Sequence, residues 1–186
     1  LDPEEVEAAL TPRTRMVVVC DPVNPFGTVQ RRDELDALLR LAERHRLVVL
    51  ADTTHSAHRV DPAARHHPLA AVAADRPGAP FLVASGLAHG YGMAGARIGA
   101  LGGPPDLVRA CLQVKIAAVR LNTNRLAQVG AAAALRDAAW PRRGEEVIRR
   151  NLAAIERVAP PVVRPAYGFS CVLDVSGIGA SAQELT

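Results

Sequence analysis

Residues 85–99 read SGLAHGYGMAGARIG, and they follow directly on the apolar run at 81–84. The apolar run predicts a buried strand, and the glycines after it predict a loop. Residues 90–95 also spell G-x-G-x-x-G, but a dinucleotide-binding fingerprint needs a helix at once and an acidic residue about 20 positions later. Residues 98–105 read instead as a short strand and a turn. The stretch therefore predicts two strands joined by a glycine-rich loop.

Two further apolar runs lie upstream, at residues 16–20 and 47–51. Neither alternates with polar residues, which is typical of strands buried on both faces of a sheet. Leucines at helical spacing over residues 32–45 separate the two runs, and strands that alternate with helices favour a parallel sheet. We therefore predict an α/β fold with a mainly parallel sheet and helices on both faces. Its strands are residues 16–20, 47–51, 81–85 and 98–101.

The other helices are predicted from apolar spacing and alanine content. They span residues 3–10, 69–74, 105–118, 124–139 and 145–158. Residues 140–144 contain a proline, a glycine and two arginines, and this composition predicts a linker. The sequence is therefore divided into two parts, residues 1–140 and residues 145–186.

Composition excludes several classes of function. The chain has 186 residues, 49% of them hydrophobic, which is enough for a sizeable core. A net charge of +3 without a clustered basic tract, and with 3% aromatic residues, makes nucleic-acid binding unexpected. No apolar run reaches membrane length, and the first residues do not form a signal peptide. Three scattered cysteines, Cys20, Cys111 and Cys171, are typical of thiols in a cytoplasmic protein.

Polar residues follow the predicted strands, where open α/β sheets bind their ligands. Residues 21–27 read DPVNPFG, Asp52 ends the second strand, and Ser85 and Arg97 flank the glycine loop. Alone, each has a plain reading: a proline–glycine turn, a carboxylate that caps a turn, and a surface arginine. In this order, the motifs resemble those of the class I/II aminotransferase family, whose members are fold-type I enzymes with the cofactor pyridoxal 5′-phosphate (PLP).

The resemblance implies a cofactor-binding role for five residues. It assigns Asn24 to the cofactor's ring oxygen and Asp52 to its pyridine nitrogen, which the carboxylate keeps protonated. It assigns Ser85 and Arg97 to the phosphate, since a guanidinium is a planar fork of donors. His55 stands where aminotransferases usually have a tyrosine. The family also implies a cis bond between Asn24 and Pro25, and an antiparallel strand at one edge of the sheet.

The family's central lysine, which bonds the cofactor covalently, is absent. The single lysine, Lys115, lies outside the motif. Counting forward from Ser85 puts the vacated position at Ala88, and counting back from Arg97 puts it at His89. We favour Ala88, in which case His89 should point aside into the glycine loop. An alanine is what an experimenter would install to inactivate the enzyme, whereas a histidine would be a natural variant that moves protons without a covalent bond.

Departures from the family motifs leave the reaction open. The pair His55–Ser56 and the segment at 66–68 resemble PLP-dependent C–S lyases of the same fold. The family therefore implies transamination, or else β/γ-elimination, with or without the ring closure of enzymes resembling capreomycidine synthase. A third alternative is an aminotransferase-like domain that binds a pyridoxal ligand without turnover. His55 and His58 lie three positions apart, with Asp52 nearby. No cysteine or other ligand is clearly placed to complete a metal site with the two histidines, so no metal site is expected. His66 and His67 are expected in a solvated loop.

The resemblance also implies an organisation. Residues 1–140 would be the C-terminal part of the large PLP-binding domain, and residues 145–186 the start of a small α/β domain. Residues 165–175 resemble a strand of that small domain. The chain would then be a piece of a longer protein. The family's sites form between two subunits, so a homodimer with an amino-acid substrate is expected.

Overall fold

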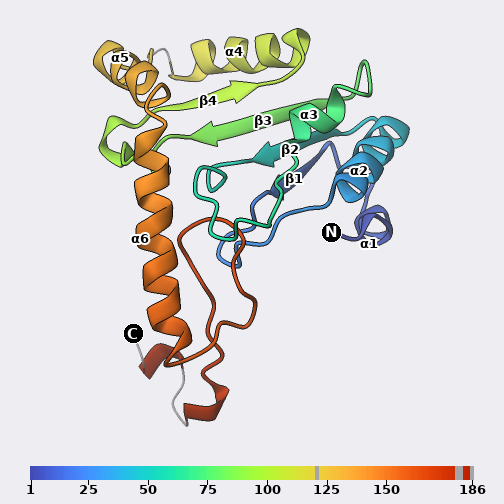
Figure 1. The fold of residues 1–186 in the computed structure, drawn as a ribbon. Coiled ribbons are helices and arrows are strands. Elements are labelled where there is room, and N and C mark those ends of the chain that lie inside the picture. The colour runs from blue at the N-terminus through green and yellow to red at the C-terminus, as the bar shows by residue number, and fades with distance from the viewer. Residues whose placement is uncertain (120–121, 179–181, 185–186) are drawn as a thin grey trace.

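The computed structural model describes residues 1–119, 122–178 and 182–184 (Figure 1). Four strands form one sheet in the order of the chain: β1 (Met16–Cys20), β2 (Val48–Asp52), β3 (Phe81–Gly86) and β4 (Gly99–Gly102). The first three run parallel, and β4 runs antiparallel to β3 at the edge. The predicted α/β fold with a mainly parallel sheet is confirmed, and so is the antiparallel edge strand.

One face of the sheet packs against three helices, α1 (Pro3–Ala8), α2 (Arg32–His45) and α3 (Leu69–Ala73). Val17 pairs with Val49 and Val19 pairs with Ala51, so these side chains share that face. The leucines of α2 recur at helical spacing and pack onto it. The buried core residues of α2 are Leu35, Leu38, Leu39, Leu41 and Ala42.

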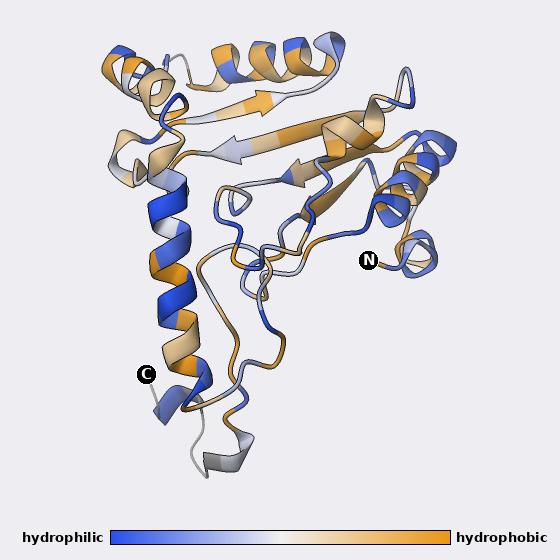
Figure 2. Cartoon of the chain, viewed as in Figure 1, coloured by the Kyte–Doolittle hydropathy of each residue, from blue (hydrophilic) through white to orange (hydrophobic). Residues whose placement is uncertain are grey.

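The opposite face of β1 lies open. Val18 is 64% exposed and Met16 is 41% exposed. The expectation that residues 16–20 are buried on both faces is therefore wrong for the described chain, because none of its described helices covers this side of β1. Figure 2 shows hydrophobic residues along β1.

Three helices follow the sheet: α4 (Pro105–Val119), α5 (Arg125–Ala134) and α6 (Ala139–Glu156). In Figure 1, α4 and α5 lie beyond β4, and α6 runs past the ends toward which the β2 and β3 arrows point. Three single-turn 3-10 helices complete the described elements: η1 (Ala94–Ala96), η2 (Ser176–Ile178) and η3 (Ala182–Glu184). None of the helices in the described residues is long and apolar enough to cross a membrane.

The linker predicted at residues 140–144 is wrong, because α6 passes through it without a break. The helix begins at Ala139, and Asp137 Oδ1 accepts the backbone N–H groups of Ala139 and Trp140. Pro141 thus falls in the first turn, where a helix loses no hydrogen bond by having a proline. The predicted helix over 124–139 accordingly divides into the whole of α5 and the first residue of α6.

The strand predicted at residues 165–175 does not form in the described chain. This segment makes only isolated bridges there, between Arg59 and Tyr167 and between Pro161 and Leu173. A strand needs a continuous ladder with a neighbour, and Pro165 lacks the N–H to contribute to one. The assignment of this part to a small domain stays a prediction.

Candidate active site

The carboxyl ends of β2 and β3 bring two of the predicted site residues close together. Asp52 is the last residue of β2 and lies beside Ala84 in the register. Ser85 is the next residue of β3. Ligands bind at such strand ends in open α/β sheets. Figure 1 shows that these ends face α6, so the candidate site lies between the sheet and that helix.

The Asp52 carboxylate is held in one orientation. Its Oδ1 accepts hydrogen bonds from the backbone N–H of Thr54, at 3.0 Å, and from the Thr54 hydroxyl, at 2.5 Å. Its Oδ2 has no hydrogen-bond partner among the described residues. One oxygen is therefore used to orient the half-buried group, and the other can accept a proton donor from a ligand. Thr54 was not singled out from the sequence, although a hydroxyl two residues after a carboxylate is a known local motif.

The loop at residues 21–27 is anchored at its start by a buried carboxylate. Asp21 is 2% exposed, and its Oδ1 accepts the backbone N–H of Gln30 at 3.0 Å. Its Oδ2 lies 3.1 Å from Nε2 of His66. The expectation that His66 lies in a solvated loop is wrong, because its side chain is 9% exposed and is engaged by this carboxylate. The anchored loop presents Asn24, which is exposed.

The same loop is anchored at its end by Gly27. The Gly27 carbonyl accepts the backbone N–H groups of Ala166 and Tyr167, at 3.0 and 2.9 Å. These bonds fix the loop to the segment after α6, which is 140 positions away in the chain. The Asn24–Pro25 bond is cis, as expected, and the Asp21–Pro22 bond is cis as well.

Replacing Gly27 with alanine is expected to destabilise the protein by about 2–5 kcal/mol, since a positive φ costs about 1–2 kcal/mol and overpacking about 1–3. Gly27 has a φ of +69°, and a Cβ there would overlap the Tyr167 carbonyl oxygen and the Pro165 side chain. Gly78 is the matched control, because its φ is +88° and a Cβ would meet nothing within 4 Å. Urea unfolding of the whole protein measures both variants. Equal losses would contradict the predicted overlap.

Three aromatic rings from distant segments meet near Asp52. The rings of His55 and His89 stack with centroids 5.3 Å apart and an interplanar angle of 15°. Phe169 tilts against both, at 5.3 Å from His55 and 5.1 Å from His89. Burial lowers the pKa of His55, and a charge on His89 lowers it further, while Asp52 raises it. We call His55, His89 and Phe169 the aromatic trio.

The two candidate positions of the missing lysine, Ala88 and His89, are neighbours in the turn after β3, and the preference for Ala88 stays a prediction. The ring of His89 contacts His55 and Phe169. Ala88 is half-buried in the same turn. Of the two candidate positions, His89 is thus the one joined to another predicted site residue by a ring contact.

Ser85 and Arg97 flank the glycine loop on opposite sides. Ser85 pairs with Ala100 in the β3–β4 register. Arg97 has a left-handed backbone with a φ of 50°, and its guanidinium donates to the Ala94 carbonyl at 3.1 Å. This hydrogen bond stays within its own turn and leaves the side chain exposed. The structure therefore does not bring Arg97 into the aromatic trio.

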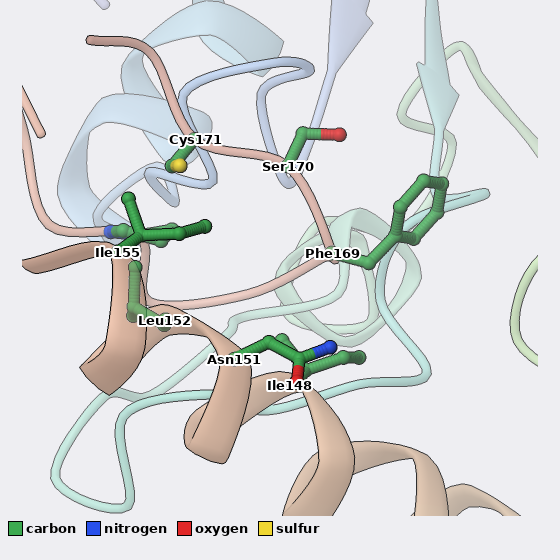
Figure 3. A pocket seen from close by; sticks show the side chains of 8 residues that line it. Ile148, Asn151, Leu152, Ile155, Phe169, Ser170 and Cys171 are labelled. Carbon is green, nitrogen blue, oxygen red and sulfur yellow. The ribbon is translucent and has the colours of Figure 1, made fainter.

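A small pocket lined by Asn24, His55 and Phe169 adjoins the trio, and so do two larger cavities to which the sequence did not point. One, of about 340 Å³, is lined by His58 and His89 together with Trp140, Arg143 and other residues of α6. The other, of about 170 Å³, lies between α6 and the segment that carries Phe169. Figure 3 shows the side chains of this second cavity, with Leu152 and Ile155 on the helix and Cys171 across from them. Within the described chain, no group of three potential metal ligands comes together.

Comparisons with known proteins agree with this geometry. The family model "Aminotransferase class I and II" matches residues 1–172. Histidinol-phosphate aminotransferase of Moorella thermoacetica is 39% identical over 142 residues, which are 75% of this chain and 34% of the relative. Aspartate/prephenate aminotransferase of Thermus thermophilus is 30% identical over 185 residues, which are 95% of this chain and 46% of the relative. The chain thus spans between a third and a half of these curated relatives.

Solved structures agree as well. A double mutant of Thermus thermophilus aspartate aminotransferase matches with a TM-score of 0.82 and 29% identity, over 96% of this chain and 47% of that one. A PLP-bound putative aminotransferase from Clostridium difficile 630 matches with a TM-score of 0.85 over 100% of this chain and 49% of that one. Because the two sequences are only 21% identical, this match shows a similarity of fold alone.

Proposed function

The chain belongs to the class I and II aminotransferase family, and from this premise we propose that the whole protein is an enzyme that acts on an amino acid. PLP is the cofactor of this family. The observation that carries the proposal is the Asp52 carboxylate at the end of β2, which Thr54 orients through Oδ1. A carboxylate held at a strand end with one oxygen available is the group needed opposite a protonated pyridine nitrogen.

The chemistry of the available donors fits PLP. Asp52 would hold the pyridine nitrogen, and Asn24 would donate to the ring oxygen. The Ser85 hydroxyl and the Arg97 guanidinium would bind the phosphate, since a charged fork of donors suits phosphate oxygens. When bound, PLP supplies an electron sink for bonds broken at the α-carbon of an amino acid.

The chain's own residues would bind and orient the reactants. The buried Asp21 holds the loop that carries Asn24, through its contacts with Gln30 and His66. His55 and Phe169 of the aromatic trio border the same region as Asn24. The family's lysine is absent, so a proton must be moved by another group. The ring contacts of His89 support the alignment counted back from Arg97.

Transamination is the first candidate reaction, because the curated relatives are aminotransferases by name. Elimination is the second, since His55–Ser56 replaces the usual tyrosine motif and His55 contacts His89. The two differ in their products, because transamination yields an oxo acid without ammonia, whereas elimination releases ammonia. A domain that binds a pyridoxal ligand without turnover would yield neither product. Assays of the whole protein for oxo acid and ammonia distinguish the three.

Replacing Arg97 with methionine is expected to weaken PLP binding by the whole protein about 10- to 150-fold, since a hydrogen bond to a charged group contributes about 1.5–3 kcal/mol. Arg40 is the control, because it lies exposed on α2 and pairs with Asp36 there. Its replacement with methionine should leave PLP affinity unchanged. Titration with PLP, followed by absorbance, measures the dissociation constants. Equal affinity of the Arg97→Met variant and the parent protein would contradict the phosphate assignment.

We propose that the whole protein is a homodimer and that it is located in the cytoplasm. The helices α4 and α5 leave large apolar side chains open, among them Val114 at 67%, Ile116 at 59% and Leu126 at 81% exposed. Such side chains are typical of surfaces that another chain or domain covers. All three cysteines are free thiols, in keeping with a reducing compartment. Light scattering of the whole protein tests the dimer, which a mass of one subunit would contradict.

A further inference from the structure

The stacked histidines His55 and His89 form a second, chemically distinct feature of the proposed active site. They come from the turn after β2 and the glycine loop after β3, and Phe169 closes over both from the segment after α6. A near-parallel stack with an interplanar angle of 15° fixes the His89 ring, although the residue itself is exposed. An imidazole held in place by two neighbouring rings is suited to proton transfer at one defined position.

We propose that His89 is the base that removes the α-proton of the amino-acid substrate, and that His55 is the residue that positions it. This inference rests on the proposed function. In the step, the unprotonated nitrogen of His89 forms an N–H bond as the α-carbon loses its C–H bond, and the electron pair of the broken bond stays with the substrate. The same nitrogen returns the proton later, so the base is restored. Histidine is suited to this exchange because its usual pKa, about 6.5, lies near physiological pH.

A cavity gives the substrate a route to His89. Its volume is about 340 Å³, within the range of small-molecule sites, roughly 300–1,000 Å³. The ring of His89 is thus in contact with His55 and Phe169 and also borders the cavity. Trp140 supplies apolar surface and Arg143 a cation to the same cavity. An amino acid has a side chain that can pack against Trp140 and a carboxylate that can pair with Arg143.

The surroundings of the stack make His55 harder to protonate than a free imidazole. Its pKa is lowered by burial first and by a charge on His89 second, with Asp52 opposing. His58 behaves similarly, because burial lowers its pKa and His55 adds to the effect, while Glu145 opposes it. Two stacked imidazoles repel each other when both carry a proton. A charge on His89 therefore lowers the pKa of His55 in the same direction as burial does.

The pairing is tested first in the whole protein without cofactor. Nuclear magnetic resonance follows the titration of the His55 ring, and His89→Gln should raise the pKa of His55 because it removes a like charge. His45→Gln is the control, since His45 is exposed on α2 and pairs with Glu7. It should leave the pKa of His55 unchanged. An unchanged His55 pKa in the His89→Gln variant would overturn the pair.

The proton transfer is tested with PLP bound. The whole protein is incubated in D₂O with the common L-amino acids, and mass spectrometry follows deuterium at the α-carbon. His89→Gln should slow the exchange about 10²- to 10⁴-fold, the usual contribution of a general base, without weakening PLP binding. Added imidazole should restore part of the rate. His45→Gln should exchange at the parental rate.

Two outcomes overturn the inference in distinguishable ways. If the His89→Gln variant binds PLP and exchanges at the parental rate, another group is the base, and the proposed function stands. If the parent protein fails to bind PLP, or binds it without exchanging any α-hydrogen, the proposed enzyme fails and the base with it. His55→Phe separates positioning from packing, since it keeps a ring on His89. A loss of exchange that depends on pH in this variant supports the role of His55, and a parental pH profile overturns it.

Discussion

Replacing Asp52 with asparagine is expected to lower turnover by the whole protein about 10²- to 10³-fold, the usual cost of removing one preorganised electrostatic group. The variant keeps an oxygen that can accept from the Thr54 N–H and hydroxyl, so the turn after β2 should remain folded. It loses the negative charge, and a neutral amide does not keep a pyridine nitrogen protonated. Steady-state kinetics with PLP and an amino acid measure the loss, and urea unfolding checks the fold.

Thr54→Val is the matched control for this prediction. Valine keeps the backbone N–H that donates to Asp52 Oδ1 at 3.0 Å but removes the hydroxyl that donates at 2.5 Å. The charge stays, and one orienting hydrogen bond is lost. A loss of about 1 kcal/mol corresponds to roughly fivefold in rate. If both variants lost activity equally, orientation rather than charge would be the contribution of Asp52, and the assignment to the pyridine nitrogen would be wrong.

The sheet could be predicted from the sequence because its signals are local. Each strand is a short apolar run that ends at polar or glycine residues, and the structure displaces the second strand by one position, from 47–51 to Val48–Asp52. The parallel order follows from the helices between the runs. The open face of β1 could not be predicted, because continuous apolar runs report hydrophobicity and not what covers it.

The prediction of a linker at 140–144 was wrong because the effect of Pro141 and Gly144 on a helix depends on the residues around them. Proline ends a helix in its interior but is accepted in the first turn, and Pro141 lies there because the helix begins at Ala139, where Asp137 Oδ1 accepts the backbone N–H groups of Ala139 and Trp140. Gly144 serves packing, since a Cβ there would lie 2.6 Å from Nε2 of His58. Both facts depend on neighbours that the composition of the stretch does not show.

Some residues of the proposed site could likewise be predicted from the sequence, and others could not. Asp52 and Ser85 lie at the carboxyl ends of strands and Asn24 lies in the loop after one, and their motifs suffice to single them out. The contact between His55 and His89 joins two loops, and Phe169 contacts both from a segment that lies at least 80 positions further along the chain. No spacing in the sequence encodes that meeting. His66 shows the same limit, because only the fold brings it to the buried Asp21.

Restoring the lysine has the largest expected effect, since it changes the protein from one without a covalent cofactor bond to one with it. We expect His89→Lys in the whole protein to bond PLP covalently and Ala88→Lys not to do so. The His89 side chain lies against His55, another residue assigned to the cofactor, and against Phe169. A covalent bond requires the amine nitrogen to reach one carbon of the cofactor, so only one of the two positions should serve.

The measurement is reduction with borohydride followed by mass spectrometry of the peptides. A PLP adduct on residue 89 is the expected result, together with a visible absorbance band that reduction removes. Ala88→Lys controls for the mere addition of an amine next to the site. An adduct on residue 88 alone would establish the count from Ser85, with Ala88 as the vacated position and His89 as its neighbour. The α-hydrogen exchange of the His89→Gln variant, compared with that of the parent protein, would still decide whether His89 is the base, because a base needs proximity to the substrate and not a bond to the cofactor.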